Sequence, residues 1–309
     1  MPILGLCGGI SQWEGRELEN GAWRICELTW DEVTSSTRRA ATIGLFDSGV
    51  GGLSVWRELV RRMPHQATLY LADSVHCPYG PRPPEEIRRF SLGIARFLIE
   101  CGAGLIVVAC NTASAVALEA LRAEFDVPIV GMEPAVKPAA ERTQAGHIGV
   151  LATEGTVNGD LFRNTSARYA RNVTVHVQVG DGLVERVEAG QADTPETESL
   201  LRTYLQPMLD AGVDQIALGC THYSFLLPVI RRIAPPGMSI IDPATAVARQ
   251  VERVLMLQDI QSDETCVAGH RFFTSGRPQV LSAMVRALTG RDSWLRKVRW
   301  ENGTLRGEE

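Results

Sequence analysis

Lysine is almost absent from this sequence. Of its 31 basic residues only Lys137 and Lys297 are lysines, and the others are arginines. Arginine stays protonated at physiological pH and does not form Schiff bases, whereas a pyridoxal phosphate enzyme needs a Schiff-base lysine. Lys137 lies beside Pro138 at an apparent helix start and Lys297 lies near the C-terminus. We therefore expect no pyridoxal cofactor.

Long apolar runs and an excess of positive charge are also missing. No apolar run reaches the roughly 18 residues of a membrane-spanning helix, and no Lys or Arg precedes the short apolar stretch in residues 1–10, so a secretory signal peptide is not expected. The formal net charge of −5 provides no basic surface for nucleic acid or an anionic membrane. We expect a cytoplasmic protein whose partner is a small molecule.

The seven cysteines form an odd, dispersed set without any C-x-x-C spacing. This pattern argues against a disulfide framework and against a structural zinc site. We expect reduced thiols, no metal and no cofactor.

From residue 42 onward, short apolar runs alternate with amphipathic helical patterns, which is typical of an α/β protein with parallel sheets. Most of the apolar runs are continuous, as expected for strands covered on both faces. The expected strands span residues 42–46, 68–72, 105–109, 128–131, 147–151, 173–179, 215–218 and 239–241, with another at 271–275. The expected helices lie at about 52–62, 111–124, 156–170, 195–211, 222–233 and 244–257, with one that begins at Pro84 and ends before Gly102 and another at 280–288.

A chain of 309 residues is long enough for two domains. We predict two pseudo-symmetric parallel-sheet lobes with the active site between them. Residues 1–41 are expected to form an N-terminal extension outside the fold, and residues 291–309 a loose tail. The sequence does not fix the oligomeric state, for which a homodimer is one option.

Two cysteines occupy equivalent positions in a faint internal repeat. Cys110 and Cys220 each follow an apolar strand and precede Thr, small polar residues and a helix. In open α/β sheets ligands bind beyond the carboxyl ends of the strands, and a helix N-terminus favours the thiolate form. Free cysteines are often small buried hydrophobes, but the matched positions favour two reactive thiols.

Other candidates lie at neighbouring strand ends. Asp47 begins a glycine-rich loop (47–52) that lacks the G-x-G-x-x-G spacing of dinucleotide sites. Its glycines can let backbone N–H groups close on a small anion such as a carboxylate, while Asp47 itself can also be a helix N-cap. His222 can exchange a proton with Cys220. Glu185 is a candidate acid–base helper, with Glu188 one turn away as the alternative.

Together these segments resemble the glutamate racemases, a cofactor-independent family that supplies D-glutamate for bacterial peptidoglycan. The resemblance covers residues 42 to about 290 and rests on four ordered motifs at 44–55, 72–80, 109–113 and 219–222. It implies that Cys110 and Cys220 are the catalytic acid–bases, assisted by Asp47 on one side and by His222 with Glu185 on the other. The substrate-binding residues that it implies are Asp47, Ser48, Tyr79, Gly80, Asn111, Thr112, Thr221 and His222. The resemblance also implies a division into a first lobe (42–134 plus 243–290), which carries Cys110, and a second lobe (135–242), which carries Cys220.

Two other functions remain open on the sequence alone. One is a racemase or isomerase for aspartate or another small acid, which would differ only in the size and polar groups of its pocket. The other is a non-catalytic α/β protein that binds a small acid or a nucleotide, which would need no pair of facing thiols. The Trp-bearing segment 1–40 is the place where a protein partner would be sought.

Overall fold

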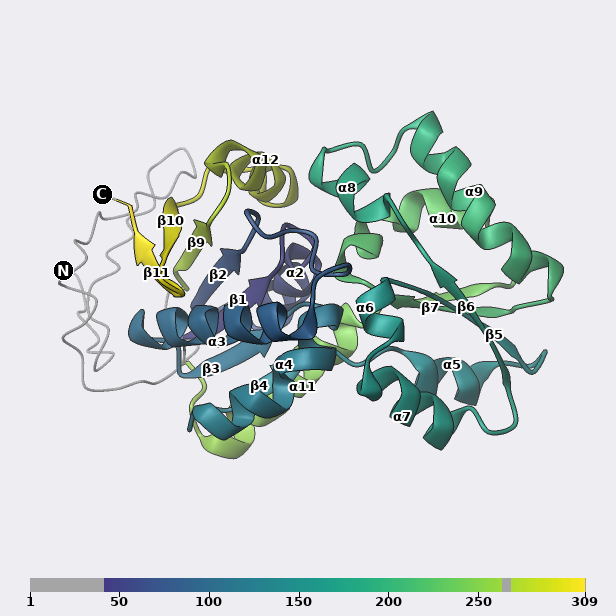
Figure 1. Cartoon of the computed structure of the whole chain (residues 1–309), viewed down its shortest axis with the longest axis horizontal. Coiled ribbons are helices and arrows are strands. Elements are labelled where there is room, and N and C mark those ends of the chain that lie inside the picture. The colour runs from purple at the N-terminus through teal and green to yellow at the C-terminus, as the bar shows by residue number, and fades with distance from the viewer. Residues whose placement is uncertain (1–41, 263–267, 309) are drawn as a thin grey trace, which may run out of the picture.

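The computed structural model describes residues 42–262 and 268–308. Two sheets flanked by helices, one mainly parallel and one entirely parallel, lie side by side, one in each half of the molecule (Figure 1). The predicted α/β class with two lobes is confirmed. The predicted N-terminal extension, with its three tryptophans, lies outside the described residues.

The first sheet has seven strands in the order β11-β10-β9-β2-β1-β3-β4. All neighbours are parallel except the final pair, β10 and β11, which are antiparallel. Strand β1, in the interior of this sheet, is fully buried, as the continuous apolar sequence predicted. The bounds are β1 Ile43–Asp47, β2 Thr68–Ala72, β3 Leu105–Val108, β4 Ile129–Gly131, β9 His270–Thr274, β10 Leu295–Glu301 and β11 Thr304–Gly307.

The second sheet has four strands in the order β6-β5-β7-β8, all parallel. In the first sheet Cys110 follows β3, which pairs with β1, the first strand of that lobe. In the second sheet Cys220 follows β7, which pairs with β5, the first strand of its lobe. The bounds are β5 His147–Ala152, β6 Thr174–Val179, β7 Gln215–Gly219 and β8 Ser239–Ile241.

The helices fall close to their predicted positions, with two differences. The predicted helix over 156–170 is divided at Gly159, which has an extended backbone and starts a second helix. The helix predicted at 222–233 begins as a 3₁₀ turn, η1, before an α-helix with Pro228 in its first turn. The bounds are α2 Leu53–Arg62, α3 Pro84–Glu100, α4 Asn111–Glu124, α5 Val136–Arg142, α6 Glu154–Val157, α7 Asp160–Tyr169, α8 Leu183–Glu188, α9 Pro195–Asp210, η1 Thr221–Leu226, α10 Leu227–Ile233, α11 Ala244–Gln258 and α12 Pro278–Thr289.

One apolar core continues from the first lobe into the second. It joins buried residues of α2, such as Leu53 and Val55, to Val229 and Ile230 of α10. Two separate clusters cover the other faces of the two sheets. Because burial of apolar surface is the main favourable term in folding, this shared core holds the carboxyl ends of the two sheets toward each other.

The prediction of a loose tail after residue 290 is wrong. Residues 295–307 form β10 and β11 and extend the first sheet. Val298 is fully buried, and the Trp300 ring lies 5.6 Å from that of Phe90. Charged residues on both sides of Val298 mask the strand pattern in the sequence, and their long side chains pair along the sheet, as Arg299 does with Glu301.

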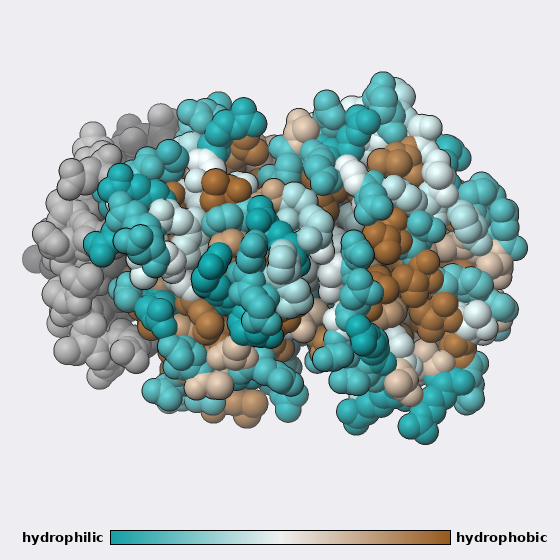
Figure 2. Space-filling model, viewed as in Figure 1, coloured by the Kyte–Doolittle hydropathy of each residue, from teal (hydrophilic) through white to brown (hydrophobic). Residues whose placement is uncertain are grey.

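The face of the molecule shown in Figure 2 is mainly hydrophilic, and its hydrophobic residues gather mostly over the second lobe. Among the described helices, none combines the length and the apolar character needed to cross a bilayer.

Candidate active site

Cys110 and Cys220 occupy matching positions at the carboxyl ends of β3 and β7. Each is the N-cap of the following helix and has an extended backbone, with φ and ψ of −140° and 123° at Cys110 and −150° and 134° at Cys220. Both side chains are nearly buried, at 5% and 6% exposure, and both thiols are free. The same local geometry therefore presents one thiol from each lobe.

The Cys110 thiol is held in its protonated form by its surroundings. Burial raises its pKa well above the usual range, and the negative charge of Asp47 raises it further. The backbone N–H groups of Ala113 and Ser48 donate to the sulfur and oppose this shift, and a negative charge on Cys220 adds to it. A thiolate at Cys110 would therefore be a strong base.

Asp47 connects the two lobes at the end of β1. Its carboxylate accepts hydrogen bonds from the Gly52 N–H at 3.1 Å and from the Thr221 hydroxyl at 3.0 Å. Burial raises the Asp47 pKa to about 6, although the charge of His222 and the Thr221 hydrogen bond lower it. Asp47 is therefore a carboxyl group that titrates near neutral pH, between the two thiol-bearing elements.

A backbone N–H of the glycine-rich loop 47–52 binds a carboxylate of the protein itself, that of Glu188. The Val50 N–H donates to Glu188 Oε1 at 2.7 Å. A Cβ atom at Gly49 would lie 1.9 Å from the same oxygen, and one at Gly51 would lie 2.3 Å from His222 Nδ1. Glycine is needed at both positions because the loop backbone packs directly on Glu188 and His222.

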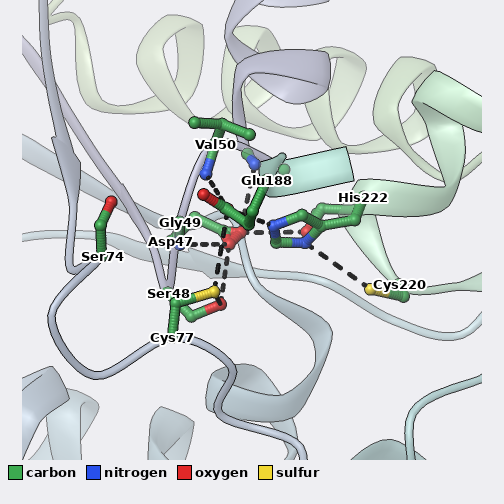
Figure 3. A network of polar contacts seen from close by, with 12 residues as sticks. Asp47, Ser48, Gly49, Val50, Ser74, Cys77, Glu188, Cys220 and His222 are labelled. Carbon is green, nitrogen blue, oxygen red and sulfur yellow. Dashed lines mark hydrogen bonds and ion pairs between the residues drawn. The ribbon is translucent and has the colours of Figure 1, made fainter. Parts of the chain in front are cut away.

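His222 lies between Glu188 and Cys220, as Figure 3 shows. Its Nε2 is 2.7 Å from Glu188 Oε1, and its Nδ1 is 3.8 Å from Cys220 Sγ. Burial alone would lower the pKa of His222, but hydrogen bonds with Cys220, Cys77 and Glu188 raise it well above the usual value. Burial likewise favours the neutral form of Glu188, yet His222 and the Val50 N–H lower its pKa overall. The pair is therefore charged, with an imidazolium next to the Cys220 sulfur.

Glu188, rather than the predicted Glu185, contacts His222. Glu185 lies in the first turn of α8 with an exposed side chain. Glu188 is the last residue of α8, and only this end of the helix reaches the Val50 backbone. The prediction of Glu185 as the helper is corrected to the alternative one turn later.

The other residues predicted to bind the substrate form two groups, one next to the thiols and one farther from them. Asn111 and Thr221 follow the two cysteines directly, and both amide atoms of Asn111 are buried without a protein partner. Ser48 donates to Asp47 at 3.3 Å. Thr112 lies 2.9 Å from the Thr153 hydroxyl of the second lobe, hydroxyl to hydroxyl.

Tyr79 and Gly80 belong to the outer part of this region. The buried Tyr79 hydroxyl donates to Asp73 Oδ2 at 2.7 Å. This hydrogen bond fixes the loop that carries Tyr79 and Gly80. Gly80 lies against Thr153, where a Cβ atom would approach to 3.3 Å. Thr153, the N-cap of α6, and Cys77 are neighbours of the site that the sequence analysis did not select.

The fold and the site define a two-lobed α/β protein with a buried thiol and an acid–base partner on each side. The family model described as Asp/Glu/Hydantoin racemase matches residues 44–251. A glutamate racemase of Roseiflexus sp. (strain RS-1) is 47% identical over 82% of this chain and 94% of its own length.

Solved structures agree with this match. The glutamate racemase isoform RacE1 of Bacillus anthracis has a TM-score of 0.77 and 30% identity, covering 86% of this chain and all of that one. The Escherichia coli glutamate racemase, solved with L-glutamate and the activator UDP-MurNAc-ala, has a TM-score of 0.75 and 32% identity, covering 84% and 98%. The chain belongs to the Asp/Glu/hydantoin racemase family and is an enzyme of the racemase type.

Proposed function

We propose that this enzyme interconverts L- and D-glutamate by transferring the α-proton between Cys110 and Cys220. The observation that carries the proposal is the matched pair of buried thiols, each at the carboxyl end of a strand and the start of a helix. Racemisation removes a proton from one face of the α-carbon and returns one to the other. Two bases on opposite sides do this without turning the substrate.

Asp47 assists Cys110. Its negative charge raises the pKa of the thiol, so the thiolate, once formed, is basic enough to remove a weakly acidic α-proton. The ammonium group of an amino acid substrate brings a positive charge into the site, which favours that thiolate.

His222 and Glu188 assist Cys220. The imidazolium is 3.8 Å from the sulfur through Nδ1 and is fixed by the Glu188 carboxylate on Nε2. A cation at this place stabilises a Cys220 thiolate and can return a proton to it. Each turnover leaves the two cysteines in exchanged protonation states.

The polar groups beside the thiols bind the substrate. The Asn111 amide, whose nitrogen and oxygen are buried without a protein partner, and the Thr112 hydroxyl, which can accept from Thr153 and donate elsewhere, supply donors for the carboxylates. Ser48 and Thr221 adjoin this region with hydroxyls that donate to Asp47. Donors on the α-carboxylate stabilise the negative charge that develops as the proton leaves. Tyr79 and Gly80 border this region through the loop that Asp73 holds.

D-Glutamate made in this way would enter peptidoglycan synthesis in the cytoplasm. We also propose the lobe division near residues 134 and 243, with the C-terminal strands in the first lobe, and a homodimer as the assembly to test first.

The direct test is to incubate the purified protein with L-glutamate and, separately, with L-aspartate in deuterated water. We expect loss of optical rotation and α-deuterium incorporation with glutamate. Turnover of aspartate alone would indicate the related small-acid racemase, and ligand binding without any exchange would indicate a non-catalytic binding protein.

A further inference from the structure

Cys77, Glu188 and His222 bring three different metal-binding atoms together. A thiol sulfur, a carboxylate oxygen and an imidazole nitrogen all lie within 4.8 Å of one another. Cys77 Sγ is 3.7 Å from Glu188 Oε1, which in turn is 2.7 Å from His222 Nε2. Figure 3 shows Cys77 approaching Glu188 from a loop of the first lobe.

One of these two distances already matches a tetrahedral zinc site, and the other is shorter. Zinc bonds of about 2.3 Å to sulfur and about 2.0–2.2 Å to nitrogen and oxygen place neighbouring ligand atoms roughly 3.3–3.6 Å apart. The sulfur–oxygen separation already fits, and the nitrogen–oxygen separation needs only to open as the metal replaces the shared proton. Thiolate and imidazole ligands favour Zn²⁺ and similar ions over Mg²⁺ or Ca²⁺.

The protein fixes two of the three ligands in advance. His222 is almost completely buried, at 1% exposure, and the Val50 N–H orients the Glu188 carboxylate through Oε1. Such outer contacts strengthen metal sites by fixing the ligand orientation.

A cavity of about 410 Å³ leads from solvent to this cluster. Cys77 and Glu188 both line it, together with Ser74, Pro78, Arg277 and Val280. The cavity provides an entry path and room for a water molecule as the fourth ligand of the metal.

We propose that Cys77, Glu188 and His222 form an inhibitory site for Zn²⁺ or a similar borderline divalent cation. Binding releases the Cys77 thiol proton and the His222 ring proton to solvent. The metal then replaces the hydrogen bond between Glu188 and His222. The His222 ring becomes neutral, so Cys220 no longer has an imidazolium beside it. The binding site stands on the geometry alone, whereas the inhibition rests on the proposed function.

Metal binding is tested first without catalysis, with Co²⁺ as a spectroscopic probe. We expect the wild-type protein to develop a thiolate-to-cobalt charge-transfer band that saturates at one equivalent. Cys77→Ala should lose this band, and the matched variant Cys101→Ala, whose thiol is buried in the other core cluster, should keep it. An unchanged band in Cys77→Ala would overturn the site.

Inhibition is tested by titrating Zn²⁺ into the racemase assay, with Mg²⁺ as the control ion. Each variant is scored against its own activity without metal. Cys77→Ala should raise the half-inhibitory Zn²⁺ concentration by at least about tenfold, the lower end of the loss caused by removing even an outer contact of a metal site. An unchanged value would assign the inhibition to another thiol and overturn this part of the proposal.

A measurement on the unsubstituted chain keeps the proposal testable if Cys77→Ala does not fold. Zn²⁺, but not Mg²⁺, should slow the alkylation of Cys77 by iodoacetamide, followed by peptide mass mapping; equal rates would contradict the site. If the protein shows the Cys77-dependent cobalt band but no racemisation, the proposed function fails while the metal site stands.

Discussion

Glu188 Oε1 lies 2.7 Å from both His222 Nε2 and the backbone nitrogen of Val50. One carboxylate oxygen at the end of α8 therefore contacts a loop of the first lobe and the histidine that adjoins Cys220. This arrangement fixes the imidazole ring with Nδ1 toward the sulfur. It also makes the geometry on the Cys220 side depend on the contact between the lobes.

Glu188→Gln should lower kcat by at least about tenfold. The amide keeps the shape of the side chain but removes the charge that orients and stabilises the imidazolium, a loss that is larger still in serine-protease triads. Because His222 adjoins Cys220, the decrease should be greater for the enantiomer that Cys220 deprotonates. Initial rates with L- and D-glutamate measure both effects.

Glu185→Gln is the matched control, since this residue lies one turn away on the same helix and is exposed. It should keep activity within about twofold of the parent, as expected of an exposed side chain away from the reacting atoms. A larger loss in Glu185→Gln than in Glu188→Gln would contradict the assignment of Glu188.

The pH profile of kcat/KM should fall below about pH 6 in the parent, because Asp47, whose pKa is about 6, then becomes protonated and loses its charge. Asp47→Asn should remove this limb and lower the plateau by about 100-fold, the lower range for a lost acid–base group. The same limb persisting in Asp47→Asn would show that another group titrates there.

The effect of Asp47→Asn on activity can be distinguished from an effect on the stability of the protein. Folding raises the Asp47 pKa, so the stability that this group contributes is full below its ordinary value of 3.8 and is lost as the pH rises through about 6. At pH 7 the buried charge of Asp47 does not stabilise the fold, so its removal in Asp47→Asn should not by itself lower the free energy of unfolding. Thermal denaturation at pH 7 provides the control.

Trp300→Phe should raise the KM for glutamate more than it lowers kcat. Its indole Nε1 donates to Asp73 Oδ1 at 2.8 Å, while Tyr79 donates to the other oxygen of the same buried carboxylate. Leaving a buried acceptor less satisfied costs about 1–3 kcal/mol and loosens the loop that carries Gly80. KM should rise by up to about tenfold.

Trp294→Phe is the comparison for Trp300→Phe, since this ring packs on Phe273, 5.4 Å away between centroids. It should reduce thermal stability without a matching rise in KM. Equal KM values for the two variants would mean that the Asp73 network does not position the loop.

The residues that the sequence identified most directly are those at the carboxyl ends of strands. Asp47, Cys110 and Cys220 each come after a buried apolar run, and in a parallel sheet that position determines that they lie at the carboxyl edge. The fold class was predictable for the same reason, because strands buried on both faces are continuous apolar runs.

The role of Glu188 and the two C-terminal strands could not be predicted from the sequence. Both depend on contacts between distant parts of the chain, which no local pattern encodes. The Glu188–Val50 hydrogen bond joins residues 138 positions apart, and it depends on how the two lobes pack together. Neighbouring turns of a helix present similar faces, so Glu185 and Glu188 could not be separated by periodicity. In β10, charged residues surround Val298 and Trp300, which conceals the alternation of a half-buried strand.

The central claim is that the two thiols serve opposite faces of one α-carbon, and solvent-deuterium exchange in the single variants tests it most directly. Cys110→Ala and Cys220→Ala should each lose racemisation by at least about 100-fold. Each variant keeps one thiol and therefore one face, so Cys110→Ala and Cys220→Ala should exchange opposite enantiomers of glutamate with solvent deuterium. Racemisation near the parental rate in either variant, or exchange of the same enantiomer by both, would contradict the two-thiol mechanism.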